Sequence, residues 1–238
     1  MDKFRPFSFC VIVFIAFLGL DNSVVSFNSD NTVYLEKELD MLWKEHDPAG
    51  KEVFLERVEK RLPNWKNLFK EAANLSEIHW TLLAAISYQE SHWNPKAISK
   101  TGVRGLMMLT QTTAKEVGML RRTDPVQSVL GGSIYIHKLI ERFPNSVPRQ
   151  DKLWMTIAAY NLGFTYVKEA REEAKANKMD PDSWEDVSKT LFLLGEDSSN
   201  ENMSRRIEEA LDYVFKVQLY FQTLSVLVRN SSEHTINS

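Results

Sequence analysis

Apolar residues recur every three or four positions along most of the chain, the spacing that places them on one face of an α-helix. The segment 33–46, for example, has leucines at 35, 39 and 42. Alternation with a period of two is sustained nowhere, so any β-sheet would be very small. The pattern predicts an all-α fold, with helices at 33–46, 51–62, 64–75, 77–90, 111–118, 124–143, 152–177, 182–194 and 203–228.

Polar and helix-breaking residues mark where these helices begin and end. Ser76 followed by Glu77 predicts the start of the apolar helix that runs towards residue 90, because serine is a common first residue of helices. Pro95, Gly102 and Gly105 predict a loop over 91–105. No internal repeat is present, so we expect one domain from about 31 to 229, then a disordered tail at 230–238.

The first 26 residues have the layout of an export segment. Lys3 and Arg5 precede an apolar stretch from Phe7 to Leu20, as in secretory signals. A membrane span needs roughly 20 apolar residues, which is more than this stretch contains. Small residues up to Ser26 provide a cleavage site. The segment is therefore either a signal peptide that is removed or a membrane anchor that is retained, and both predict export.

The composition is that of an ordinary soluble protein, with 43% hydrophobic residues, 26% charged residues and a net charge of −3. This balance argues against nucleic acid as a partner. Cys10, the only cysteine, lies in the export segment, either as a lipid-attachment site or as an apolar filler. Neither disulfides nor cysteine–zinc sites are then available to the mature chain. His79, His92 and His137 lack the spacing of metal ligands, so no metal or other cofactor is predicted.

One acid stands out against the helical pattern. Residues seven apart in a helix differ by only about 20° in direction, so Leu83, Ile86 and Glu90 share one stripe. If that stripe faces the core, desolvation raises the pKa of Glu90 into the range of a general acid near neutral pH. A glutamate at a frayed helix end, facing water, fits the same pattern.

Three blocks around and after this acid resemble the lytic transglycosylases of bacterial cell walls, above all the membrane-bound lytic murein transglycosylase F subgroup. They are "ESHWNP" at 90–95, "TGVRGLMMLT" at 101–110 and "AAYNLG" at 158–163. The resemblance runs from about Leu75 to Leu194. It implies a lysozyme-like α fold and a catalytic domain over 75–229, preceded by an N-terminal lead-in with helices over 27–74.

The resemblance also implies the reaction. Such enzymes cleave the β-1,4 bond between N-acetylmuramic acid and N-acetylglucosamine in peptidoglycan without consuming water. Glu90 would protonate the glycosidic oxygen and then act as a base on the C6 hydroxyl, which closes a 1,6-anhydro ring. Glycosidases usually need two carboxylates, but an intramolecular hydroxyl dispenses with the second. Accordingly, Asp124, Glu141 and Glu116 have ordinary amphipathic settings, in which solvated positions are expected.

The matching motifs imply further contacts with the glycan. Each candidate also has an ordinary interpretation. Ser91 could cap a helix, Gly105 could serve a turn, and Met107 and Met108 could pack in the core. Tyr160 and Asn161 could simply lie at a helix end before Gly163. Trp93 has the ring that stacking on a sugar requires. The substrate-binding residues predicted by resemblance are Ser91, Gly105, Met107, Met108, Tyr160 and Asn161.

The resemblance implies a periplasmic location, with possible membrane association through residues 1–26, and glycan strands as the partner. Long relatives carry a solute-binding-like domain for which the residues before Asn74 are too few. Relatives also have a tyrosine-containing segment before the last helix, where this chain has only Arg206, Glu209 and Tyr213. Two alternatives are a muramidase resembling goose-type lysozyme and an inactive wall-binding scaffold. The presence of Glu90 argues against the scaffold.

Overall fold

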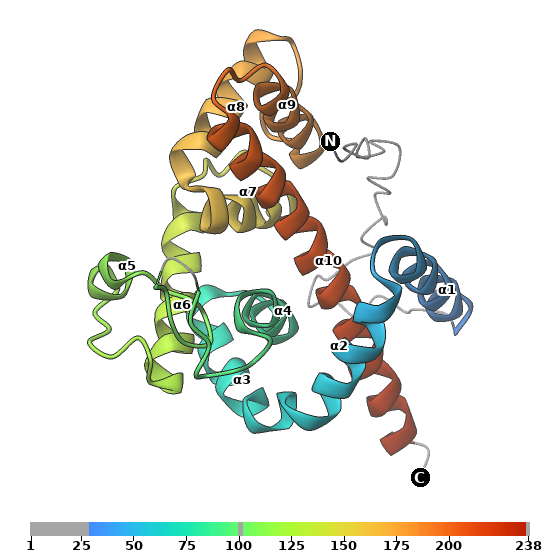
Figure 1. Ribbon diagram of the computed structural model, residues 1–238. Helices are drawn as coiled ribbons and strands as arrows, with labels where there is room; N and C mark the ends of the chain where they lie inside the picture. Colours follow the sequence, from blue (N-terminus) through green and yellow to red (C-terminus); the bar gives the residue numbers. More distant parts are fainter. Residues whose placement is uncertain (1–28, 100–101, 237–238) are drawn as a thin grey trace, which may run out of the picture.

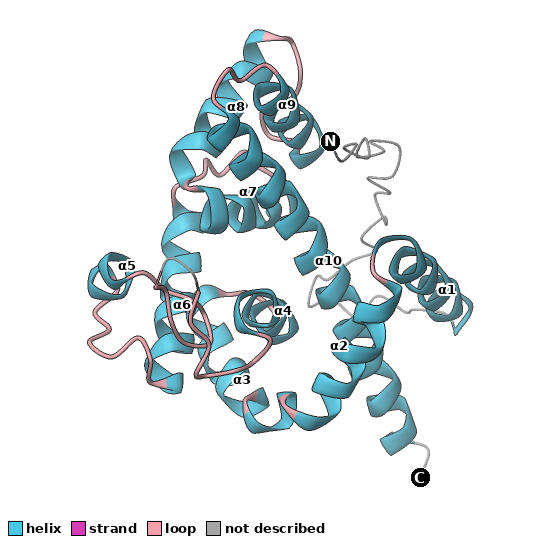
Figure 2. Cartoon of the chain, viewed as in Figure 1, coloured by secondary structure: helices cyan, strands magenta, loops and turns pink. Residues whose placement is uncertain are grey.

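The structure, a computed structural model, describes residues 29–99 and 102–236. The predicted export segment lies outside the described residues. Figure 2 shows helices joined by loops, and the described residues form no strand. Two isolated bridges, between Ile98 and Arg104 and between Arg104 and Leu109, are the only β-type pairs in this part of the chain. The predicted all-α class is therefore confirmed.

The helices follow one another with short connections. They are α1 (Ser29–His46), α2 (Pro48–Lys60), the 3-10 helix η2 (Leu62–Asn64), α3 (Lys66–Ser76), α4 (Trp80–Ser91), α5 (Gln111–Glu116), α6 (Pro125–Glu141), α7 (Arg149–Leu162), α8 (Phe164–Ala176), α9 (Trp184–Glu196) and α10 (Glu201–Ile236).

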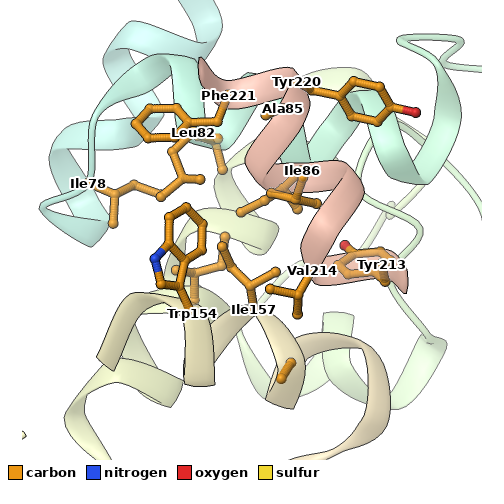
Figure 3. Packing of buried hydrophobic residues seen from close by; sticks show 14 of the residues in the cluster. Ile78, Leu82, Ala85, Ile86, Trp154, Ile157, Tyr213, Val214, Tyr220 and Phe221 are labelled. Carbon is orange, nitrogen blue, oxygen red and sulfur yellow. The ribbon is translucent and has the colours of Figure 1, made fainter. Parts of the chain in front are cut away.

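Helix α4 lies at the centre of the molecule. Figure 1 shows it surrounded by other helices, and it packs on α10 and α3. Every residue from Thr81 to Tyr88 is buried, which explains why this sequence is apolar on all sides. Burial of one Leu or Ile side chain stabilises a fold by roughly 1.5–3 kcal/mol. The core around α4 in Figure 3 combines residues from α4, α7, α10 and the segment before α4, namely Ile78, Leu82, Ala85, Ile86, Trp154, Ile157, Tyr213, Val214, Tyr220 and Phe221.

The long helix α10 packs against α9, the helix before it, and against α1, the first helix of the described part of the chain. It runs from α9, past α7 and α4, to α1, as Figure 1 shows. Near its far end the hydroxyl of Thr223 accepts a hydrogen bond from the indole of Trp43 in α1, at 3.1 Å. The Trp43 ring also contacts Phe54 of α2 and Tyr220 of α10, with centroids 5.6 and 5.7 Å away. One hydrophobic core therefore includes residues from Leu39 to Val226.

Three predicted boundaries are wrong. Ser76 ends α3 instead of starting α4: its hydroxyl accepts a hydrogen bond from Ser133 of α6, and Glu77 turns the chain with a φ of 54°. The predicted helix 152–177 is divided into α7 and α8 at Gly163, whose φ is 109°. The last helix continues to Ile236, through most of the segment predicted as a disordered tail.

Candidate active site

Glu90 is the second-last residue of α4, at the point where the buried helix reaches the surface. Leu83 and Ile86, which share its stripe, are buried, as is every residue from Thr81 to Tyr88, so the predicted burial of this stripe is confirmed. The Glu90 residue as a whole keeps partial exposure. Burial of its carboxyl group raises the pKa of Glu90 to about 7. Near neutral pH, this acid is thus present in both its protonated and its ionised form.

The partner of this acid is Tyr213 from α10. The Tyr213 hydroxyl donates a hydrogen bond to Oε1 of Glu90 at 2.5 Å. Burial, followed by the charge of Glu90, raises the pKa of Tyr213 well above its usual value, so the phenol keeps its proton and remains a donor. The hydrogen bond stabilises the carboxylate and opposes the effect of burial on the pKa of Glu90. These residues are 123 positions apart, and no local sequence pattern connects them.

Two serines of α4 hold the following loop in place. Both Ser87 and Ser91 direct their hydroxyls at the carbonyl oxygen of Leu106, at 3.0 Å each. Ser91 also lies 3.0 Å from the carbonyl oxygen of Ser87 and is only 4% exposed. The predicted contact of Ser91 with the glycan is therefore wrong, because its hydroxyl faces the protein interior. Ser91 instead connects the end of α4 to the loop that begins at Gly105.

The two methionines of this loop have different surroundings. The side chain of Met107 is fully buried, so the predicted direct contact with the glycan is wrong for this side chain. Its backbone has a structural role: the N–H donates to the Ser128 hydroxyl at 3.1 Å, and the carbonyl accepts from the Tyr160 hydroxyl at 2.8 Å. Met108 is partly exposed and has a φ of 45°, and it stays a candidate for substrate contact.

Gly105 is required by the packing of the loop. Its φ of 88° lies in the left-handed region that glycine adopts without strain. A Cβ atom at this position would overlap the carbonyl oxygen of Arg122 and lie 2.8 Å from Oγ of Ser128. Gly105 is also buried, so a close approach to protein backbone explains it here, and the predicted approach to a sugar stays a prediction.

Tyr160 and Asn161 lie at the end of α7, as the resemblance implied. The Tyr160 residue is partly exposed, but burial and then the charge of Glu90 raise the pKa of its hydroxyl well above the usual value. Tyr160 therefore belongs to the same group of side chains as Glu90 and Tyr213. Asn161 is exposed, which leaves its amide available to a ligand.

Trp93 is not available for stacking on a sugar. It is 1% exposed, and its indole donates a hydrogen bond to the carbonyl oxygen of Ala84 at 2.8 Å. The predicted role of this ring in glycan binding is therefore wrong. The ring packs against Tyr88 and Phe54 instead, with centroids 4.8 and 6.0 Å away.

The three other acids considered from the sequence have ordinary roles. Asp124 caps the N-terminus of α6 by accepting from the Gln127 N–H at 3.0 Å. Glu141 pairs with His137 at 3.4 Å, and Glu116 pairs with Lys138 at 3.8 Å, both on the surface. The pKa of Glu90 is governed by burial and Tyr213. Within the described residues, nothing indicates a second carboxylate that acts with Glu90.

Within the described residues, no helix combines the length and the apolar character needed to cross a bilayer.

Comparison with known proteins shows that the chain is similar to lytic murein transglycosylases. Residues 67–182 match the transglycosylase SLT domain. The chain is 43% identical over 181 residues to membrane-bound lytic murein transglycosylase F of Photobacterium profundum, and 46% identical over 170 residues to that of Maricaulis maris. These alignments cover 75% and 70% of this chain, but only 35% and 37% of the relatives. The chain thus spans about a third of the length of these relatives.

A solved structure supports the fold. The inactive glutamate-to-glutamine mutant of lytic transglycosylase Slt from Pseudomonas aeruginosa superimposes with a TM-score of 0.51, at 20% sequence identity. The match covers 68% of this chain and 24% of that one. At this level of identity, the likeness shows the arrangement of helices, which agrees with the fold implied by the sequence motifs.

Proposed function

Because residues 67–182 belong to the transglycosylase SLT domain family, we propose that this chain is a lytic transglycosylase that cleaves peptidoglycan. The observation that carries the proposal is the state of Glu90. Its carboxyl group is desolvated, hydrogen-bonded to Tyr213 and held at a pKa of about 7. A group with this pKa both gives and takes a proton near neutral pH, and the proposed reaction needs both steps from one residue.

In the proposed reaction, protonated Glu90 donates its proton to the oxygen of the β-1,4 bond between N-acetylmuramic acid and N-acetylglucosamine. The bond from C1 of the muramoyl sugar to that oxygen breaks. The C6 hydroxyl of the same sugar then bonds to C1, and the Glu90 carboxylate takes its proton. The ring closes as a 1,6-anhydro sugar, Glu90 regains its proton, and no water is consumed.

The surroundings of Glu90 agree with a mechanism that uses one carboxylate. A hydrolase that activates water or forms a covalent intermediate usually needs a second acid near the first. The acids considered for that role cap a helix or pair with basic side chains on the surface. Tyr213 assists by stabilising the ionised form of Glu90 between the two proton transfers. Met108 and Asn161, which keep exposed surface, are the proposed glycan contacts.

The location follows from the same proposal. A peptidoglycan-cleaving enzyme must be exported, and the charged and then apolar residues 1–26 fit that need. The relatives in Photobacterium and Maricaulis are named membrane-bound enzymes. We therefore propose a periplasmic protein that acts on glycan strands, with residues 1–26 as a removed signal or a retained membrane anchor.

The proposal is tested by digestion of purified peptidoglycan with protein lacking residues 1–26, followed by mass spectrometry of the soluble products. We expect muropeptides with a 1,6-anhydro end. Products heavier by one water would instead identify a muramidase, the alternative that resembles goose-type lysozyme. No soluble product at all, from folded protein, would identify the inactive wall-binding scaffold.

The pH dependence of product release should report the pKa of Glu90. The acid must start protonated, so release is expected to fall about tenfold per pH unit above about 7. In Tyr213→Phe the hydrogen bond that lowers the pKa of Glu90 is absent, so this alkaline decline should move to higher pH. Initial rates between pH 5 and 9 measure both profiles. A decline at the same pH in the variant would show that Tyr213 does not set the pKa of this acid.

A further inference from the structure

The turn that follows the proposed acid has an unusual backbone. His92 and Trp93, directly after the last residue of α4, have φ values of 52° and 56°. Two consecutive residues other than glycine in the left-handed region are disfavoured, because their Cβ atoms crowd the backbone. Such conformations persist only where the surrounding structure holds them.

Two side chains from the N-terminal part of the chain bind the carbonyl groups of these two residues. Nη1 of Arg61 donates a hydrogen bond to the carbonyl oxygen of His92 at 3.0 Å. Nε1 of Trp65 donates to the carbonyl oxygen of Trp93 at 3.2 Å. Arg61 and Trp65 flank the short helix η2 and are called the bracing pair below. Each strained residue thus has its own donor.

We propose that the bracing pair, Arg61 and Trp65, positions the catalytic acid by holding the left-handed turn His92–Trp93 at the end of α4. This inference rests on the function proposed above. Glu90 lies two residues before the turn, on the last turn of the helix. Both donors precede residue 67, where the match to the SLT domain begins. The acid is therefore oriented by residues outside the matched segment.

Arg61 of the bracing pair lies outside the hydrophobic core, whereas the ring of Trp65 packs against it. The hydrogen bond of Arg61 is exposed, and that of Trp65 is partly buried. A cavity of about 330 Å³ lies beside them, lined by Arg61, Asn64, Trp65, Trp93, Asn94 and Pro95. Because the hydrogen bond that the Arg61 guanidinium donates is exposed, its removal leaves no void in the hydrophobic core. Loss of the bracing pair should thus release the turn while the fold is retained.

The test compares product release by Arg61→Ala, Arg61→Lys, Trp65→Phe and the double variant Arg61→Ala with Trp65→Phe. Phenylalanine retains an aromatic ring but lacks the N–H donor. We expect kcat to fall about 10- to 100-fold in the double variant with KM within about twofold, as small misplacements of reacting groups cause. Arg61→Lys should restore part of kcat. The matched control is Lys60→Ala, an exposed neighbour paired with Glu56, which should retain full activity.

A second readout does not depend on activity. Glu90 can be titrated by carbon NMR of protein labelled at the glutamate carboxyl groups, with its signal assigned by its loss in Glu90→Gln. Release of the turn should admit water to the carboxyl group and lower the pKa of Glu90 towards its ordinary value. The titratable groups that face Glu90 from other elements are Tyr213 of α10 and Tyr160 of α7, and both are retained in every variant.

The outcomes separate this inference from the proposed function. If wild-type protein releases no anhydro product, the proposed function fails, while the titration still tests the bracing pair. If kcat and the titration of Glu90 are unchanged in the double variant, and only its melting temperature falls, then Arg61 and Trp65 are merely structural and the inference is overturned.

Discussion

Replacing Glu90 with glutamine is expected to abolish release of 1,6-anhydro products, with kcat lowered by about 10³-fold or more. Glutamine retains the size of the protonated acid but has no proton to give to the glycosidic oxygen. It also cannot accept the proton of the C6 hydroxyl, so both proposed steps fail together. Mass spectrometry of peptidoglycan digests measures the loss. A Glu90→Gln protein with wild-type activity would remove Glu90 from the catalytic role.

The same variant provides a control for folding. The pKa of Glu90 is raised in the folded protein, so ionisation of the buried carboxyl group costs stability as the pH rises from about 4.5 through about 7. Glu90→Gln avoids this cost. The two proteins should therefore unfold alike in acid, and above pH 7 the variant should be more stable, by at most about 3 kcal/mol. Urea unfolding at pH 4.5 and pH 8 tests the difference.

Replacing Gly105 with alanine is expected to destabilise the fold by about 3–5 kcal/mol. Alanine disfavours the left-handed backbone at this position. Its Cβ would also overlap the Arg122 carbonyl oxygen and crowd Ser128. Relief of this overlap would displace the loop whose carbonyl groups accept hydrogen bonds from α4 and α7. Product release should fall as well, because the same loop accepts a hydrogen bond from Ser91, the residue next to the acid. Urea unfolding monitored by circular dichroism measures the loss of stability.

Gly118→Ala is the matched control for this change. Gly118 has a similar φ of 77°, but a Cβ there would meet no atom within 4 Å. It should cost only about 1–2 kcal/mol, the strain of the left-handed backbone alone. Equal losses in the two variants would show that the loop at Gly105 relaxes around the added atom, contrary to the expected overlap.

The helices could be predicted because they depend on local periodicity. The burial of α4 could be predicted from its apolar residues, but the direction of Glu90 could not, since every residue from Thr81 to Tyr88 is buried. The start of α4 was predicted wrongly because it depends on a contact that is not local. Ser76 has the chemistry of a helix cap, but its hydroxyl instead joins α3 to α6 through Ser133, a contact 57 positions away.

The contents of the site were less predictable than its location. Motif resemblance identified the residues around Glu90 but not the direction of each side chain, so Ser91 and Met107 were expected to face the glycan and instead face the protein. In the sequence, Tyr213 stands out only as part of the segment that departs from the relatives. Its contact with Glu90 depends on how α10 crosses α4, which no pattern within either helix encodes.

The course of α10 sets the limits within which the proposed catalytic unit could be transplanted or fused. One helix, about 54 Å long at 1.5 Å per residue, supplies the hydroxyl partner of Glu90 at Tyr213 and the anchor of α1 at Thr223. An insert restricted to residues 67–182 would have neither, and it would expose the apolar side of α4 on which α10 packs. A graft into another protein would therefore have to include the whole segment from α1 to at least Val226.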